Sequence, residues 1–125
     1  MIYKGSCHCQ AIKFEIEAPE TIEVFECNCS VCRKFSFVHL ILPLANFKLL
    51  QGQANLSSYR FNTKVANHTF CKTCGVKPFY TPRSNPDGVS VNLNAIDTPI
   101  REAKVQKFDG QNWEDHASTI GHLSK

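Results

Sequence analysis

The sequence contains no long apolar run and no secretory signal, and these two absences exclude several classes of protein. No segment approaches the roughly 20 consecutive apolar residues that a membrane-spanning helix needs. Residues 1–10 lack the basic and then apolar pattern of a signal peptide. We therefore expect a cytoplasmic protein without a membrane partner, or a nuclear one if the source is eukaryotic.

Strong charge and long-range sequence patterns are also missing. The formal net charge of +3 suits attraction to small anions, but it is far from the signature of a nucleic-acid-binding protein. No repeat, low-complexity tract or linker divides the 125 residues, so we expect one zinc-binding domain over residues 1–125. Nothing in the sequence selects an oligomeric state.

Helical periodicity is almost absent, and short runs typical of β-strands take its place. Apolar and charged residues alternate over residues 12–17, which indicates an antiparallel strand with one buried face. We predict a mainly β domain with a short terminal helix within residues 112–122. Its strands are predicted in residues 11–17, 22–26, 37–42, 56–61, 65–70, 76–80 and 89–93.

Seven cysteines are the most unusual feature of the composition. Disulfides are rare in a reducing compartment, so clustered cysteines there indicate a metal site or catalysis. The odd number excludes complete pairing within one chain. A secreted disulfide scaffold is the alternative, but the absence of a signal peptide disfavours it.

Four of the cysteines form two pairs with the spacing of a structural zinc site. Cys7 and Cys9 would point to the same face of an extended strand. Cys71 and Cys74 have the spacing of a zinc knuckle, and Gly75 follows where such a turn often needs a positive φ. Four thiolates around one ion make a closed site, so we expect this zinc to be required for folding.

The other three cysteines, Cys27, Cys29 and Cys32, lie within six residues. Three protein ligands and one open position are the arrangement of a catalytic zinc, which can take water or a substrate thiolate. Arg33 and Lys34 follow, and their charge would favour thiolates and attract a substrate carboxylate. Alternatively, the three cysteines take a fourth ligand from elsewhere and are purely structural, or they are vestigial, and the basic pair is only a solvated face.

The histidines and aromatic residues are interpreted as structural. His39 lies in an apolar run, which favours a core residue with satisfied hydrogen bonds over a metal ligand. His68, His116 and His122 are expected at the surface and receive no role. The aromatic residues closest to the cysteines are expected to pack around the metal sites, and some to wall a pocket: Phe35, Phe37, Phe70, Phe79 and Tyr80.

Three segments resemble the glutathione-dependent formaldehyde-activating enzyme family: residues 5–9 (GSCHC), 27–33 (CNCSVCR) and 70–75 (FCKTCG). The order and spacing of all seven cysteines match that family. The following residues, 76–86 (VKPFYTPRSNP), are similar to the branch that contains centromere protein V.

Two positions depart from the family pattern. Asn28 stands where the middle motif usually has histidine, and Gln10 stands where the first motif often has glycine. Neither change removes a ligand, but Asn28 removes a possible proton carrier near the second metal.

This resemblance implies an Mss4-like fold of several short antiparallel sheets built around two Zn²⁺ ions per chain. It also implies carbon–sulfur lyase activity, in the founding case the joining of formaldehyde to glutathione as S-hydroxymethylglutathione. The chain is thus predicted to act on a small glutathione-like thiol and an aldehyde, with Arg33 and Arg83 as candidates for binding substrate carboxylates. The implied ligand sets are Cys7, Cys9, Cys71 and Cys74 for a structural zinc, and Cys27, Cys29 and Cys32 for a catalytic-type zinc.

Two other functions stay open, because a shared family does not fix the substrate of each member. The likeness to the centromere protein V branch motivates a non-catalytic zinc-binding interaction module. A zinc carrier or metal-dependent chaperone would instead exchange metal readily at the three-cysteine site. A binding module would tolerate alanine at Cys29 if folding survived, whereas an enzyme would not.

Overall fold

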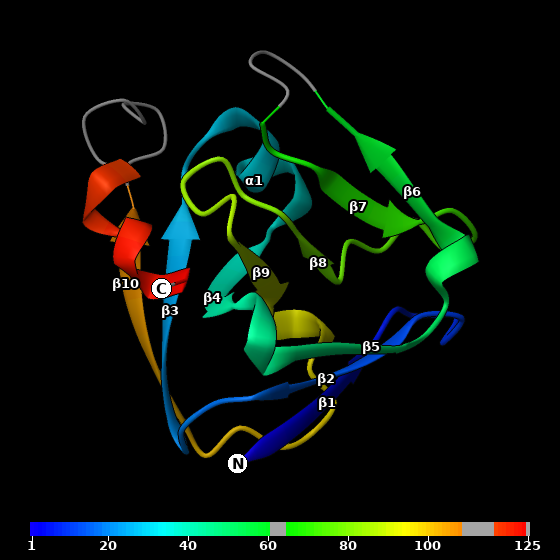
Figure 1. Cartoon of the computed structure of the whole chain (residues 1–125), viewed down its shortest axis with the longest axis horizontal. Helices are drawn as coiled ribbons and strands as arrows, with labels where there is room; N and C mark the ends of the chain where they lie inside the picture. The colour runs from blue at the N-terminus through cyan, green and yellow to red at the C-terminus, as the bar shows by residue number, and fades with distance from the viewer. Residues whose placement is uncertain (61–64, 109–116, 125) are drawn as a thin grey trace.

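Three β-sheets form most of the computed structural model, which describes residues 1–60, 65–108 and 117–124 (Figure 1). One α-helix, α1 (Ser30–Phe35), lies within this part of the chain. The strands are β1 Ile2–Ser6, β2 Lys13–Glu17, β3 Thr21–Cys27, β4 Val38–Pro43, β5 Phe47–Gln51, β6 Leu56–Tyr59, β7 His68–Cys71, β8 Phe79–Tyr80, β9 Gly88–Asn92 and β10 Glu102–Phe108. The 3₁₀ turns are Leu44–Asn46, Gln53–Asn55, Leu93–Ala95, Ala117–Thr119 and Gly121–Ser124.

The largest sheet has the strand order β10-β3-β4-β9-β8, and it carries the second cysteine group at one end of β3. A second sheet has the order β1-β2-β5, and β6 pairs with β7 as a third. Neighbouring strands are antiparallel, except that β10 runs parallel to β3 along the edge of the large sheet (Figure 1). The prediction of a mainly β domain with several small sheets is confirmed.

Each predicted strand region contains an observed strand, but three strands were not predicted. These are β1, β5 and β10. The terminal helix predicted within residues 112–122 falls partly on residues 109–116, which lie outside the described residues. From residue 117 onward the chain forms two 3₁₀ turns rather than an α-helix.

The main core lies where the sheets meet. Phe14 of β2 is fully buried, and its ring stacks on Phe47 at 5.7 Å and meets the edge of Phe79 at 5.5 Å. These contacts join the β1-β2-β5 sheet to β8 of the large sheet. Full burial of one such aromatic side chain stabilises the fold by about 2–3 kcal/mol. The alternating apolar residues of β2 are therefore the ones that pack in the core. Cys7 and Cys71 belong to the same buried cluster.

A second, smaller cluster involves β3, β4 and β10. Phe25, Ile41, Phe108 and Ile120 form it. The 3₁₀ turns after residue 117 are held by the buried Asn85, whose Nδ2 donates to the carbonyl oxygens of Ile120 and Gly121. Within the described ranges, no helix has the length and apolar character needed to cross a bilayer.

Candidate metal centres

The sulfurs of Cys7, Cys9, Cys71 and Cys74 converge from two distant turns. All four lie within 4.8 Å of one another, and Cys9 Sγ is 3.6 Å from both Cys7 Sγ and Cys71 Sγ. A tetrahedral zinc with Zn–S bonds of 2.3 Å places its sulfurs about 3.8 Å apart. The four cysteines therefore fit a closed tetrathiolate zinc site, which we name the clamp site.

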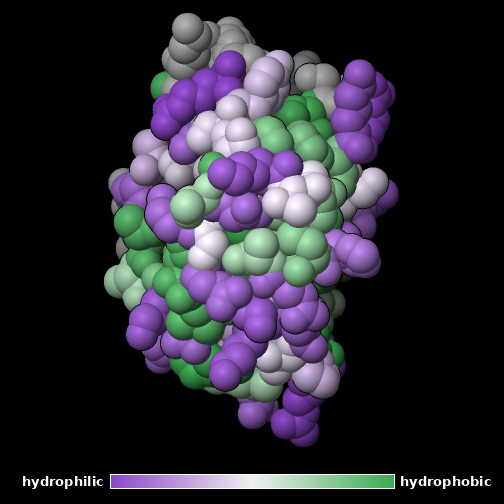
Figure 2. All heavy atoms as spheres, turned by 90° about the vertical axis from the view of Figure 1, so that its right-hand side faces the viewer, coloured by the Kyte–Doolittle hydropathy of each residue, from purple (hydrophilic) through white to green (hydrophobic). Residues whose placement is uncertain are grey.

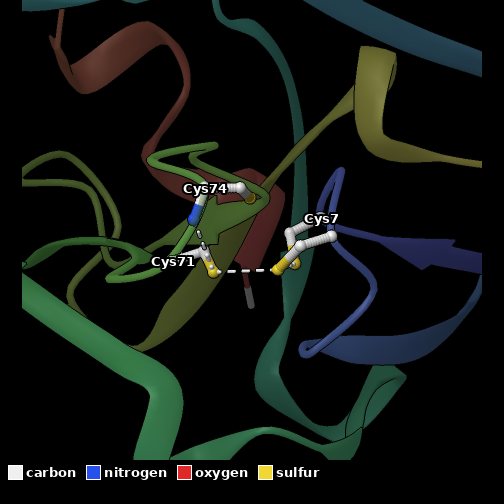
Figure 3. Close-up of side chains that lie close together, drawn as sticks. Cys7, Cys71 and Cys74 are labelled. Atoms are coloured by element: carbon white, nitrogen blue, oxygen red, sulfur yellow. Dashed lines mark hydrogen bonds between the residues drawn. The ribbon is translucent and has the colours of Figure 1, made fainter.

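Cys71 at the end of β7 and Cys74 in the turn that follows supply two sulfurs to the clamp site (Figure 3). The Gly75 amide donates to the Cys71 carbonyl at 2.8 Å, and the Cys74 amide donates to Cys71 Sγ at 3.4 Å. Gly75 has φ +79°, so the prediction of a left-handed residue at this position is confirmed. These bonds aim both sulfurs to the same side of the turn.

The other half of the clamp site forms differently from the prediction. Cys7 and Cys9 lie in a tight turn after β1, not in an extended strand. The Gln10 amide donates to the Cys7 carbonyl at 3.1 Å, and the Ile12 amide donates to Cys7 Sγ at 3.4 Å. The strand argument was therefore wrong about the local structure, although the two sulfurs do meet.

This turn forces Gln10 into a left-handed conformation with φ +65°. A residue with a Cβ is strained there by about 1 kcal/mol, whereas glycine is not. We expect Gln10→Gly to raise the free energy of unfolding by about 0.5–1 kcal/mol without changing metal content. Urea unfolding of the metal-loaded protein measures this, with Gln53→Gly as the control that should destabilise. A lower free energy of unfolding in Gln10→Gly would show that the left-handed backbone of Gln10 is not strained.

Asn55 is a clamp-site neighbour that the sequence did not reveal. Its side-chain Nδ2 donates to Cys71 Sγ at 3.0 Å, and its backbone carbonyl accepts from the backbone amide of Lys72 at 3.0 Å. Burial opposes ionisation of Cys71, yet amide hydrogen bonds from Cys74 and Thr73 bring the pKa of its thiol down to about 6. The thiolate form that a metal requires is therefore favoured at Cys71, whereas the pKa of the Cys9 thiol is raised to about 11.

The second cysteine group is built where β3 ends and α1 begins. Cys27 is the last residue of β3, and Cys29 is the N-cap of α1, with its Sγ accepting from the Cys32 amide at 3.4 Å. Cys32 lies inside α1 and is buried, whereas Cys27 and Cys29 are half-buried. Hydrogen bonds from Cys27 and Cys32 lower the pKa of the Cys29 thiol. The sulfurs of Cys27 and Cys32 lie within 4.8 Å of each other, whereas the Cys29 sulfur lies outside the closest set of possible ligand atoms.

His39 of β4 joins this group, which the sequence did not indicate. The sulfurs of Cys27 and Cys32 and one ring nitrogen of His39 lie within 4.8 Å of one another. Burial, and then the charge of Lys77, lowers the pKa of His39 to about 3, so its ring is neutral and offers a lone pair. His39 is buried as predicted, but not fully satisfied, because its Nε2 has no hydrogen-bond partner among the described residues.

A buried lysine lies beside the second cysteine group. Lys77 is 3% exposed, with its Nζ 2.6 Å from His68 Nδ1 and 3.7 Å from the centre of the Tyr80 ring. The rings of Phe35 and Phe37 lie at 4.9 and 5.0 Å from the same nitrogen. Burial lowers the pKa of Lys77 to about 8, while the thiolates of Cys32, Cys29 and Cys27 act in the opposite direction.

Because thiolates stabilise the Lys77 ammonium, the ammonium stabilises the thiolates in return. We expect Lys77→Met to lower the affinity of the second cysteine group for zinc by roughly 10-fold, the effect typical of an outer neighbour of a metal site. Competition against a chromophoric chelator measures it. Lys72→Met is the matched control, since Lys72 is exposed beside the clamp site. An equal effect of both variants would contradict a specific role for Lys77.

A surface pocket of about 450 Å³ adjoins this group. Arg33, a predicted contact for substrate carboxylates, lines it, and so does Lys107 of β10, which the sequence did not suggest. Arg83 does not line it and lies in the connection between β8 and β9. The full lining is Glu26, Cys27, Asn28, Arg33, Lys107 and Phe108.

Comparison with known proteins agrees with the cysteine pattern and the fold. The family model of the glutathione-dependent formaldehyde-activating enzyme matches residues 2–113. A Halomonas elongata protein provisionally named as such an enzyme is 26% identical over 108 residues, which are 80% of this chain and 69% of that protein. The crystal structure of a Rhodobacter sphaeroides protein is similar, with a TM-score of 0.71 and 30% identity over 82% of this chain and 99% of that one. The chain therefore belongs to the glutathione-dependent formaldehyde-activating enzyme family.

Proposed function

We propose that the protein is a zinc-dependent carbon–sulfur lyase that joins a glutathione-like thiol to a small aldehyde, or separates them. The observation that carries this proposal is the pocket at Cys27, which brings a solvent-accessible cavity to the edge of the second cysteine group. The clamp site offers four thiolate ligands to one ion, so it fits a structural role. A cytoplasmic location, which would keep the seven cysteines reduced, belongs to the same proposal.

The second cysteine group has the donor chemistry that zinc prefers. The sulfurs of Cys27 and Cys32 lie close together, and the thiol of Cys29, which hydrogen-bonds to both, would complete a set of sulfur ligands that suits zinc. The Lys77 charge offsets the negative charge of the thiolates. Zinc held there would favour the thiolate form of a substrate thiol, which is the nucleophile toward an aldehyde. In the addition, a sulfur–carbon bond forms, the carbonyl π bond breaks, and the thiol proton ends on the former carbonyl oxygen.

The pocket supplies groups that could orient the rest of such a thiol. Arg33 and Lys107 would bind carboxylates, and Glu26 would bind an ammonium group. Glutathione carries two carboxylates and one amine, so its charges complement this set. Asn28 also lines the pocket, where the family usually has a histidine.

The test is the rate at which zinc-loaded protein forms the adduct of ¹³C-formaldehyde with glutathione, followed by NMR exchange measurements. We expect a rate above the spontaneous reaction that rises in proportion to protein concentration. Several thiols should be compared, including one without carboxylates, which should react less well. If no thiol and aldehyde pair reacts faster than spontaneously, the proposal fails.

A non-catalytic interaction module is the alternative, motivated by the likeness of residues 76–86 to the centromere protein V branch. The face turned to the right in Figure 1 mixes hydrophilic and hydrophobic residues, and so offers no obvious apolar docking surface there (Figure 2). The pocket at Cys27 favours the enzyme instead. A non-catalytic module would still bind its partner even if the protein does not speed the formation of any thiol–aldehyde adduct.

A further inference from the structure

The His39 side chain presents an unusual hydrogen-bonding pattern. It is only 5% exposed, and its Nδ1 contacts Ser90 Oγ at 2.9 Å and the Tyr80 hydroxyl at 3.3 Å. Its Nε2 is buried and has no partner within the described part of the chain. Buried polar atoms are almost always satisfied, so an exception calls for a partner of another kind.

The chemistry around His39 identifies that partner. One of its ring nitrogens lies within 4.8 Å of the sulfurs of Cys27 and Cys32, which are themselves within that distance of each other. In a tetrahedral zinc site the sulfur–nitrogen separation is about 3.6 Å, so shifts of no more than about 1 Å would close the group. We propose that His39 is a protein ligand of the second metal centre, bound through its imidazole together with the cysteines.

The surrounding elements hold the ring in place for this role. His39 pairs with Phe25 of β3 and Asn92 of β9, so its strand is fixed on both sides. Phe37 packs on the ring at 4.6 Å. Histidines that bind metals usually donate their other ring N–H to a neighbouring group, and the Ser90 hydroxyl of β9 occupies that position here.

A histidine ligand at the second metal centre would change how the proposed reaction starts. If Cys29 is also bound, the resting centre has four ligands, and a substrate thiol must displace one of them. The imidazole is the one neutral ligand of that set, so it could leave without taking up a proton. The inference requires a metal at the second centre but not the carbon–sulfur chemistry, so either proposal can fail without the other.

The direct test uses wild-type protein loaded with ¹¹³Cd and labelled with ¹⁵N-histidine. We expect two cadmium ions per chain and a one-bond cadmium–nitrogen coupling at one imidazole nitrogen of His39, assigned by its loss in His39→Gln. The absence of that coupling with two ions bound would overturn the inference, and so would the binding of only one ion.

Zinc affinity gives a second readout that does not depend on activity. We expect His39→Gln to lower the affinity of the second centre for zinc by more than about 100-fold. Loss of a direct ligand should have a larger effect than the 10–100-fold loss of affinity typical when a neighbour of the ligands is replaced. His68→Gln is the matched control, since His68, expected at the surface, is instead buried and stacks on Tyr80 at 4.8 Å but is not part of the group. Because His68 contacts Lys77, the control should lose no more affinity than the roughly 10-fold expected for Lys77→Met. The control should retain the coupling. An unchanged second-zinc affinity in His39→Gln would contradict the proposal.

Discussion

Replacing Cys71 by serine is expected to leave the domain largely unfolded at 25 °C. Cys71 is fully buried in the main core, and its sulfur meets that of Cys9, 62 residues earlier in the chain. Structural zinc contributes about 10–16 kcal/mol in small domains, while the net stability of a protein is about 5–15 kcal/mol. Removing one ligand from the clamp site is therefore expected to remove a large fraction of the free energy of unfolding.

Circular dichroism and zinc content measure this outcome together. We expect Cys71→Ser to lose the clamp zinc and most of its strand signal, and we expect prolonged chelation to do the same to the wild-type protein. The matched control is the same chemical change in the other group, Cys29→Ser, which should stay folded. A Cys71→Ser protein with an unchanged melting temperature would show that the fold does not depend on the clamp site.

The sequence predicted strands where side chains alternate or are buried on both faces. β2 and β4 follow those two patterns, since Phe14 and Ile16 are buried in the first and the central residues of the second are all buried. The sequence did not predict β10, because most of its side chains are exposed. Its sequence, EAKVQKF, therefore lacks the regular alternation of apolar and polar residues that predicts a strand. Its pairing with β3 is parallel and joins segments about 80 residues apart, which no local pattern can indicate.

The two cysteine groups were predictable for a different reason. Within each group the ligands are close in sequence, so short turns bring them together, as at Cys71, Cys74 and Gly75. His39 and Lys77 reach the second group only through the register of β4 and the position of β8 in the sheet. Each is a polar residue within a buried apolar run, which is the one sequence signal that could have raised the question.

The second large effect is expected for Cys29→Ser, which should abolish most of the adduct-forming activity while the protein stays folded. Cys29 caps α1 through its side chain, and serine is a preferred N-cap residue, so the hydroxyl can accept the same hydrogen bond from the Cys32 amide. The hydroxyl is a much poorer zinc ligand at neutral pH than a thiolate. We expect adduct formation to fall by more than about 100-fold while the strand signal and the clamp zinc remain.

Cys29→Ala is the companion variant, because it removes the cap as well as the sulfur. It should lose activity equally and cost about 1 kcal/mol more in unfolding free energy than Cys29→Ser. The sulfur of Cys29 lies outside the set formed by Cys27, Cys32 and His39, so the result also decides the ligand set. If Cys29→Ser keeps its second zinc and its activity, these three residues alone hold the metal, and the fourth position is the one that a substrate thiol enters.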